Sequence, residues 1–267
     1  MSKRPQLSSP LYMSAKISLE TVSKSFQSMA GGIVHALKSV SLTIEKGEFL
    51  TVVGSSGSGK STLLQLIAGI ERPSSGTIKF DSDNSKPRIG FVFQNNTVFP
   101  WRTVEENLTY ALEVSGVARS TRRATSLELC RTIGLNPESF LQKFPKELSG
   151  GETRRVAIGM ALAYEANILL MDEPTSQLDY WTKLHMQEMV QSIWMQKAFT
   201  TVYVTHDIDE SIILGDRVVV FERGEVRYEL PIELPRPRDK TMLASAEFCA
   251  YRNDILDRTD TIYGEQK

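Results

Sequence analysis

The chain has 267 residues, which suits one large domain or a core domain with one insertion, and its 41% hydrophobic and 24% charged residues are typical of a globular protein. A net charge of −1 at pH 7 gives no indication of a general polyanion-binding surface, although a local basic patch is still possible. Its two cysteines, Cys130 and Cys249, are far apart and form no CxxC pair, which argues against a disulfide framework or a zinc site and fits a reducing cytoplasm.

The first 16 residues contain basic residues, serine and proline but no continuous apolar stretch. We therefore expect residues 1–16 to be a disordered tail and not a secretory signal. Residues 17–26 and 41–53 are predicted strands, with Gly31 and Gly32 in a turn between them. No run in the chain approaches the roughly 18 apolar residues that span a bilayer, so membrane association would need a partner.

Strands and helices then alternate. Residues 48–54 form a buried strand that enters a glycine-rich loop and an apolar helix, and residues 76–80 and 88–93 are further strands. Strands return at 167–174 and 199–207, and both end in polar side chains. This alternation predicts a parallel sheet with helices on both faces.

The region from about residue 103 to 165 has a helical pattern, in which Val104, Leu108, Ala111 and Leu112 have the spacing of one helix face. The next predicted helix carries Arg119, Arg122, Arg123 and Arg131. Neighbouring glutamates dilute this charge, so we interpret it as a solvated helix face and expect no nucleic-acid partner.

The last part of the chain begins with a hairpin over residues 216–230, which has an Arg-Gly turn. Prolines keep residues 231–239 extended, and residues 241–267 are predicted to be a C-terminal helix and tail.

A phosphate-binding loop is predicted at residues 54–61, because GSSGSGKS matches G-x-x-x-x-G-K-[ST] in full, between a strand and a helix. Glycines let consecutive backbone N–H groups converge on phosphate oxygens, and the helix N-terminus adds its positive dipole end. A Gly/Ser-rich turn that precedes a helix by chance is the alternative, and the register of strand, loop and helix disfavours it. The motif predicts a nucleotide site but does not separate kinases, GTPases and ATPase motors.

Each part of this loop has an expected role. Lys60 would reach the β- and γ-phosphates, Ser61 would place its hydroxyl on Mg²⁺, and Thr62 would lie near the α/β-phosphate side. The predicted nucleotide-binding residues of the loop are Gly54, Ser55, Ser56, Gly57, Ser58, Gly59, Lys60, Ser61 and Thr62.

Two adjacent carboxylates, Asp172 and Glu173, end the strand at 167–174, on the side where an α/β sheet binds its ligands. Asp172 suits a contact to Mg²⁺, and Glu173 suits a general base that polarises the attacking water. Alternatively, both acids cap the next turn, where Pro174 follows. His206 ends the neighbouring strand and could orient the water on the γ-phosphate, although a lone histidine is often structural.

The segment LSGGE, residues 148–152, completes a pattern that resembles the ATP-binding subunit of an ABC transporter, together with the phosphate loop, Gln94, LLMDEP, SQLD (residues 176–179) and His206. These motifs occur in the family's order over roughly residues 17–240, and kinases and GTPases lack the Leu-Ser-Gly-Gly element. The resemblance implies a P-loop NTPase (ABC ATPase) fold of the α/β class. This fold has a parallel-sheet core, an N-terminal antiparallel β subdomain and an α-helical insertion at about 100–165.

The resemblance also implies that two ATPase subunits, identical or different, sandwich two ATP molecules head to tail. Ser149, Gly150 and Gly151 would contact the nucleotide of the partner, and they precede a helix N-terminus that suits an anion. Asp179 would end the dimer-contact loop. Phe26 matches the position that stacks on adenine, although tyrosine is more usual there.

The resemblance makes Gln94 the residue that reaches Mg²⁺ and the attacking water. Catalysis would therefore rest on Glu173, His206, Lys60 and Gln94, and Mg²⁺ would be held by Ser61, Gln94 and Asp172.

Some positions depart from the family pattern. Glu152 replaces a common glutamine, and because a carboxylate near phosphate is repulsive, we expect it to point away or to pair with Arg154 or Arg155. Gly159-Met160 stands where Ala-Arg is common, and Gln177 replaces a small residue in the dimer-contact loop. None of these changes removes a phosphate contact or a catalytic group.

Residues 93–108 and the tract LPRPRD, residues 234–239, resemble the nitrate/sulfonate/taurine/bicarbonate importer group. The resemblance implies a subunit on the cytoplasmic side of the bacterial plasma membrane, bound to a permease and served by an external solute-binding protein. Phe99, Pro100 and Trp101 would receive a permease helix, or else form a buried hinge cluster.

The sequence leaves two other functions possible. A non-transport ABC ATPase of DNA repair or translation would usually carry two cassettes or a long insertion, whereas this chain shows one cassette. A subunit that holds ATP without hydrolysing it is disfavoured by intact Lys60, Asp172, Glu173 and His206.

Overall fold

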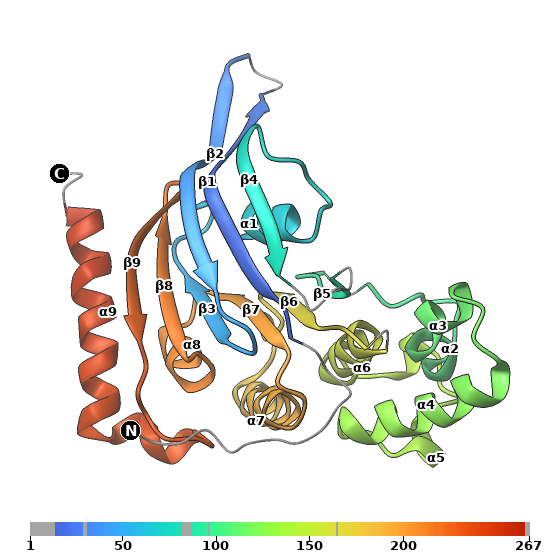
Figure 1. Cartoon of the computed structure of the whole chain (residues 1–267). Coiled ribbons are helices and arrows are strands. Elements are labelled where there is room, and N and C mark those ends of the chain that lie inside the picture. Colours follow the sequence, from blue (N-terminus) through green and yellow to red (C-terminus); the bar gives the residue numbers. More distant parts are fainter. Residues whose placement is uncertain (1–13, 29–30, 82–86, 96, 164, 265–267) are drawn as a thin grey trace.

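The computed structural model describes residues 14–28, 31–81, 87–95, 97–163 and 165–264. Of the tail predicted for residues 1–16, residues 1–13 lie outside the described residues. Figure 1 shows a central sheet with a second sheet in front of it, helices packed around both, and the helices of the insertion gathered at one side of the molecule.

The central sheet has the order β5-β6-β7-β3-β8-β9 within the described residues. Its strands are β3 (Phe49–Val53), β5 (Ile89–Val92), β6 (Ile168–Asp172), β7 (Thr200–Thr205), β8 (Arg217–Glu222) and β9 (Glu225–Pro231). All neighbouring strands pair in parallel except the β8–β9 hairpin. The parallel sheet predicted from strand–helix alternation is therefore confirmed, and the carboxyl ends of β3, β5, β6 and β7 share one edge.

The second sheet is antiparallel, with the order β2-β1-β4. Its strands are β1 (Lys16–Gln27), β2 (Ile33–Ile44) and β4 (Ser75–Asp81). It is the antiparallel β subdomain that the family resemblance implied. The strand predicted at 41–53 is wrong as one element, because a turn separates the end of β2 from β3. In that turn Gly47 has φ 71° and Glu48 N donates to Glu45 O at 3.1 Å.

Helices cover both faces of the central sheet. They are α1 (Lys60–Ile67), α2 (Val104–Leu108), α3 (Tyr110–Val114), α4 (Arg119–Thr132), α5 (Pro137–Phe140), α6 (Gly150–Leu162), α7 (Tyr180–Lys197), α8 (Ile208–Leu214) and α9 (Ala246–Gly264), with short 3₁₀ turns at Pro145–Glu147 and Lys240–Ala244. One apolar core joins the antiparallel sheet and α1 to side chains such as Val202 and Val204 of β7. The other core packs α2, α4 and α6 to α9 around Tyr203 on the opposite face of the same strand.

The helix predicted from Val104 onward is shorter than its pattern suggested. Thr109 separates α2 from α3, with φ −106° and its hydroxyl bonded to Glu105 O at 2.8 Å. Val104 and Leu108 are buried, but Ala111 and Leu112 are only half-buried, so the four residues do not share one buried face. A threonine hydroxyl that bonds a carbonyl one turn back commonly bends a helix.

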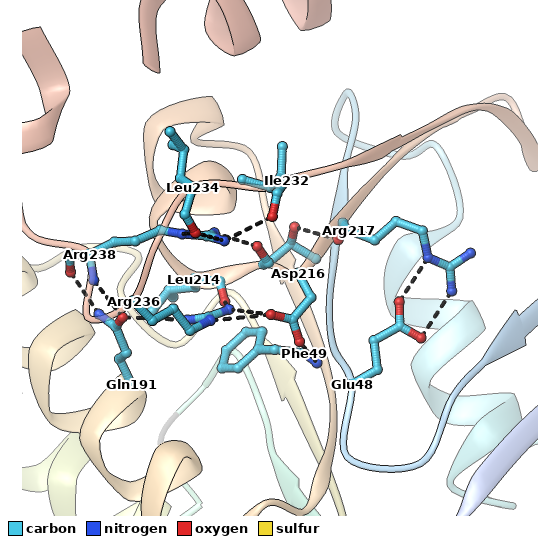
Figure 2. A network of polar contacts seen from close by, with 12 residues as sticks. Glu48, Phe49, Gln191, Leu214, Asp216, Arg217, Ile232, Leu234, Arg236 and Arg238 are labelled. Carbon is cyan, nitrogen blue, oxygen red and sulfur yellow. Dashed lines mark hydrogen bonds and ion pairs between the residues drawn. The ribbon is translucent and has the colours of Figure 1, made fainter. Parts of the chain in front are cut away.

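The segment after β9 runs back across α7 and the C-terminal end of α8 (Figure 2). The buried guanidinium of Arg238 donates to Ile212 O at 2.7 Å and Gly215 O at 2.6 Å. Gln191 of α7 bonds both the backbone N–H and the carbonyl of Arg238, each at 2.7 Å. Burial and the neighbouring Arg236 lower the pKa of Arg238 to about 9, which still leaves the guanidinium charged at neutral pH.

None of the helices in the described part of the chain combines the length and the apolar composition that a bilayer-spanning helix needs.

Candidate functional site

The glycine-rich loop connects β3 to α1, as the motif predicts, and its glycines lie where other residues do not fit. Gly59 has φ 105°, and a Cβ there would lie 2.3 Å from Ala36 O. A Cβ at Gly54 would lie 1.9 Å from Phe221 O. The loop is therefore packed tightly between β2 and the end of β8, and only glycine permits that approach.

The β8–β9 hairpin supports this loop from behind. Its turn consists of Arg223 and Gly224, both with positive φ, as the Arg-Gly pair predicts. Gly224 N donates to Ser58 O at 2.8 Å, and Ser55 Oγ donates to both carboxylate oxygens of Glu222 at 2.8 and 2.9 Å. The sequence reasoning missed Glu222, although a glutamate at the end of an apolar strand is itself unusual.

Lys60 begins α1 and is almost fully buried. Its ammonium donates to Gly54 O at 2.8 Å and Ser55 O at 2.7 Å, so the side chain curls over the loop. Burial lowers the pKa of Lys60, whereas the carboxylates of Glu173, Asp172 and Glu222 act in the opposite direction. A desolvated cation held in this way is suited to bind a phosphate oxygen.

Side chains from the ends of three neighbouring strands meet beside the loop. Glu173 follows β6, Gln94 follows β5 and His206 follows β7. Gln94 Nε2 donates to Glu173 Oε2 at 3.1 Å, and His206 Nδ1 lies 3.4 Å from the same oxygen. One carboxylate oxygen is therefore flanked by an amide and an imidazole, which can orient it toward a reacting water.

The backbone of Glu173 adopts an uncommon conformation, with φ 45°. Its N–H donates to Val204 O at 3.0 Å, and Ser176 Oγ donates to its carbonyl at 2.8 Å. A left-handed conformation at a non-glycine residue costs about 1–3 kcal/mol and persists only where the surroundings impose it. These bonds aim the Glu173 side chain into the site.

Asp172 ends β6 and is buried, and its Oδ1 has no hydrogen-bond partner among the described residues. Burial raises the pKa of this carboxyl, and a hydrogen bond from the Ser61 side chain opposes that rise. An unpartnered buried carboxylate oxygen beside a serine hydroxyl matches the oxygen donors that Mg²⁺ prefers. No cluster of three His, Cys, Asp or Glu side chains that could hold a metal ion exists in the described part of the chain.

Lys60, Gln94, Glu173 and His206 line one pocket of about 450 Å³, whereas the buried Asp172 is not part of the described lining. The lining is Val34, His35, Ala36, Ser56, Gly57, Gly59, Lys60, Ser61, Thr62, Gln94, Glu173 and His206. His35, which is bonded to Ser25 Oγ at 2.9 Å, was missed from the sequence because β2 was not recognised before residue 41. Phe26 is not in the described lining, but it pairs across the strands with Val34, which is, and it is 38% exposed.

The segment at residues 148–152 lies apart from this pocket, because none of its residues is in the described lining. Ser149 and Gly150 are exposed at the N-terminus of α6, where a Cβ on Gly151 would clash with Thr182 of α7 at 2.6 Å. Asp179 accepts hydrogen bonds from Trp181 N and Thr182 N, both at 3.1 Å, and so caps α7. A hydrogen bond from the Thr182 side chain is the largest cause that lowers the pKa of Asp179, and these backbone bonds add to it.

No ion pair joins Glu152 to Arg154 or Arg155 in the described part of the chain, so the expected pairing with an arginine is wrong. The carboxylate of Glu152 accepts from Ser149 N at 2.7 Å, while Ser149 Oγ accepts from Glu152 N, which together form a capping box. Arg154 is buried and donates to Phe93 O and Gln94 O, both at 2.6 Å, and Arg155 donates to Ile133 O at 2.9 Å. A glutamate at the third helical position is attracted to the free N–H groups at the start of its own helix.

The chain is similar in sequence to proteins of one family. A family model described as "ABC transporter" matches residues 37–176. The chain is 40% identical, over 91% of its length and 95% of the relative's, to an aliphatic sulfonates import ATP-binding protein of Bacillus cereus. It is also 40% identical, over 92% of its length and 91% of the relative's, to an uncharacterized ABC transporter ATP-binding protein of Methanocaldococcus jannaschii.

Among solved structures, the chain is similar to a dimeric ATP-binding cassette in a post-hydrolysis state bound to ADP and Pi. The two share a TM-score of 0.73 and 33% identity, over 82% of this chain and 100% of that one.

Proposed function

The chain belongs to the ABC transporter family, and from that premise we propose that it is the subunit that binds and hydrolyses ATP for a membrane importer. The observation that carries the proposal is that the side chains of Gln94 and His206 both approach one carboxylate oxygen of Glu173, in the pocket that Lys60 also lines. Several relatives that match over most of the chain are named as aliphatic sulfonates import ATP-binding proteins, so the DNA-repair or translation alternative is not favoured.

Binding of ATP is assigned to the loop at residues 54–62. Backbone N–H groups of the loop and the N-terminus of α1 would face the phosphates, and Lys60 would exchange its carbonyl partners for β- and γ-phosphate oxygens. The adenine would lie toward β1 and β2, where His35 lines the pocket and Phe26 pairs with Val34, another lining residue.

The donor set at Ser61, Asp172 and Gln94 fits Mg²⁺, as the unpartnered oxygen of Asp172 indicates. When bound, the ion would neutralise charge on the phosphate oxygens. Asp172 and the Ser61 hydroxyl would hold the ion at the carboxyl end of β6, and Gln94 would approach it from β5.

Glu173 would act as the general base. Its carboxylate would take up a proton from water as the water oxygen bonds to the γ-phosphorus and the bond from that phosphorus to the β–γ bridging oxygen breaks, which releases ADP and phosphate. Gln94 would orient that carboxylate through its amide, and His206 would orient the water and the γ-phosphate from the end of β7.

A second copy of the subunit would complete each site. Ser149, Gly150 and Gly151 are not in the described lining of the chain's own pocket, and the exposed start of α6 suits an anion. We therefore assign them to the γ-phosphate bound by the partner, with Asp179 in the loop between the two subunits. Support comes from the dimeric state of the similar cassette that was solved with ADP and Pi.

The importer would place this subunit on the cytoplasmic side of the membrane, bound to a permease that receives solute from an external binding protein. The relatives' names make an aliphatic sulfonate the first solute to test. Co-purification from detergent-solubilised membranes, followed by ATP-dependent sulfonate uptake in vesicles, tests the role. Recovery with ribosomes or DNA, and no membrane partner, would overturn it.

Trp101 is the proposed contact with the permease, because it is 71% exposed and its ring lies 5.7 Å from that of Phe99. This exposure favours a docking surface over the buried hinge cluster. We expect Trp101→Ala to weaken permease binding about 10-fold or more, as loss of an aromatic anchor does, and to leave ATP affinity unchanged. Titration of the permease in detergent measures the first quantity, and nucleotide titration measures the second.

Leu256→Ala is the matched control for Trp101→Ala, because Leu256 is an exposed apolar residue of α9, a helix that Figure 1 shows at the opposite side of the molecule from α2 and α3. It should change neither affinity. An equal loss of ATP affinity in Trp101→Ala would show that Trp101 serves folding and does not contact the permease.

Arg154 is expected to hold the Gln94 loop in place through its bonds to Phe93 O and Gln94 O. Arg154→Met keeps much of the aliphatic stem but leaves both carbonyls without that donor. We expect kcat to fall about 10-fold with little change in KM for ATP, because the catalytic amide would be displaced. Arg155→Met removes a similar bond, to Ile133 O, from the same helix. If both variants lose kcat equally, the effect reflects stability and not the position of Gln94.

A further inference from the structure

A buried carboxylate lies behind the catalytic residues without touching the pocket. Glu210 of α8 is 1% exposed. Its Oε1 accepts from Thr175 Oγ1 at 2.6 Å, Tyr203 OH at 2.8 Å and Gln187 Nε2 at 3.2 Å, and its Oε2 accepts from Thr205 Oγ1 at 2.5 Å. A buried network of this kind fixes its members strongly, because each lost bond leaves a desolvated polar group.

Two of the donors lie beside catalytic residues. Thr175 is two residues after Glu173, and Thr205 immediately precedes His206. The Thr205 hydroxyl also accepts from Asp207 N at 3.1 Å. Glu210 therefore joins the loop after β6 to the end of β7 through two short hydrogen bonds.

The helix that carries Glu210 is itself held at both ends against α7. At its N-terminus, Lys183 pairs with Asp207 at 2.7 Å. At its C-terminus, Arg238 binds the last carbonyls of α8, and Gln191 holds the backbone of Arg238 (Figure 2). Lys183, Gln187 and Gln191 are four residues apart and so lie along one face of α7. Because α8 is fixed in this way, its carboxylate is a rigid reference point.

We propose that Glu210 is a positioning residue for ATP hydrolysis, whose carboxylate fixes the loop of Glu173 relative to His206 through Thr175 and Thr205. The proposal rests on the function proposed above. Glu210 does not line the nucleotide pocket, so it acts only through the residues that do. It also connects these residues to α7, which begins at the dimer-contact residue Asp179.

Tyr203 provides an internal control. Its hydroxyl bonds the same carboxylate of Glu210, but Tyr203 is adjacent in sequence to neither Glu173 nor His206. Burial and Glu210 raise the pKa of Tyr203 well above its ordinary value, so its hydroxyl stays a donor at neutral pH. Tyr203→Phe removes the bond to Glu210 Oε1 and a longer contact of 3.5 Å with Thr175 Oγ1, but it leaves the bonds of Thr175 and Thr205 to Glu210 in place.

The test compares kcat and KM for ATP in Thr175→Val, Thr205→Val and Tyr203→Phe, with thermal unfolding measured on each. We expect kcat to fall about 10- to 100-fold in both threonine variants, because a displacement of catalytic groups by about 1 Å has effects of that size, while KM changes less than about 3-fold. Tyr203→Phe should keep kcat within about 3-fold of the unaltered chain even if its stability falls as much.

Thr175→Ser and Thr205→Ser keep the hydroxyl, so they should restore kcat, and they keep the test open if a valine variant fails to fold. Threonine-to-valine variants that lose no more kcat than Tyr203→Phe would overturn the positioning role, and so would serine variants as slow as the valine ones. If the unaltered chain itself hydrolyses no ATP, the proposed function fails first, and this role fails with it.

Discussion

Glu173→Gln is expected to abolish ATP turnover, with a loss of about 10³-fold, which is within the usual contribution of a general base. The amide keeps the size of the side chain and can still accept a hydrogen bond from Gln94, which lies 3.1 Å from the carboxylate in the present structure. It cannot take a proton from water. ATP should therefore still bind, and the closed dimer should persist because the γ-phosphate is not removed.

Phosphate release measures the loss of turnover, nucleotide titration measures binding, and size-exclusion chromatography with ATP detects the trapped dimer. Glu233→Gln, the same change at an exposed glutamate after β9, is the control and should behave as the unaltered chain does. Turnover that survives in Glu173→Gln would remove Glu173 from the role of base, and turnover lost together with ATP binding would indicate a damaged pocket.

Lys60→Met should remove ATP binding itself. Methionine keeps an unbranched apolar stem, but the change takes away the only ammonium bonded to Gly54 O and Ser55 O within the described residues. Three carboxylates around it, those of Glu173, Asp172 and Glu222, would also lose their cation. Breaking a buried charge pair costs about 3–5 kcal/mol, so ATP affinity should fall by at least about 100-fold.

Isothermal titration with ATP checks this loss. Lys146→Met, at an exposed lysine before α6, is the matched control and should bind ATP normally. Undiminished affinity in Lys60→Met would contradict the assignment of the loop as the phosphate site.

The phosphate loop and the strand ends could be predicted because their signals are local. The glycine spacing at residues 54–61 requires a loop between a strand and a helix, and parallel strands bring Glu173 and His206 to one edge. The predicted α/β fold with its antiparallel subdomain and helical insertion is confirmed by the sheets and by the similar cassettes. The precise hydrogen bonds among these side chains could not be predicted from spacing.

The supporting residues could not be found in the same way, because their partners are distant in sequence. Glu222 holds Ser55 across 167 residues, and Arg154 reaches Gln94 across 60. His35 was missed because the exposed start of β2 lacks the alternation of a half-buried strand. Glu152 was misjudged because the attraction of a carboxylate to its own helix N-terminus outweighed the expected pairing with an arginine.

The contacts of Arg154 suggest how the two ends of the insertion communicate. Arg154 lies on α6, whose N-cap is the exposed Ser149, and it binds the carbonyl of Gln94, which lines the proposed nucleotide pocket. Trp101 follows a few residues after Gln94. A change at the dimer contact could thus reach both the catalytic amide and the proposed permease contact through one buried side chain.

The central claim is that two subunits form each hydrolytic site, and the ATPase rate of a mixture of two inactive variants tests it most directly. Lys60→Met lacks the phosphate cation, and Ser149→Arg blocks the exposed start of α6. In a mixed dimer, one site combines the intact loop of one chain with the intact Ser149 of the other. Random pairing places about half of the chains in such dimers, so the mixture should regain up to about a quarter of the unaltered rate. A mixture as inactive as each variant alone would contradict the account.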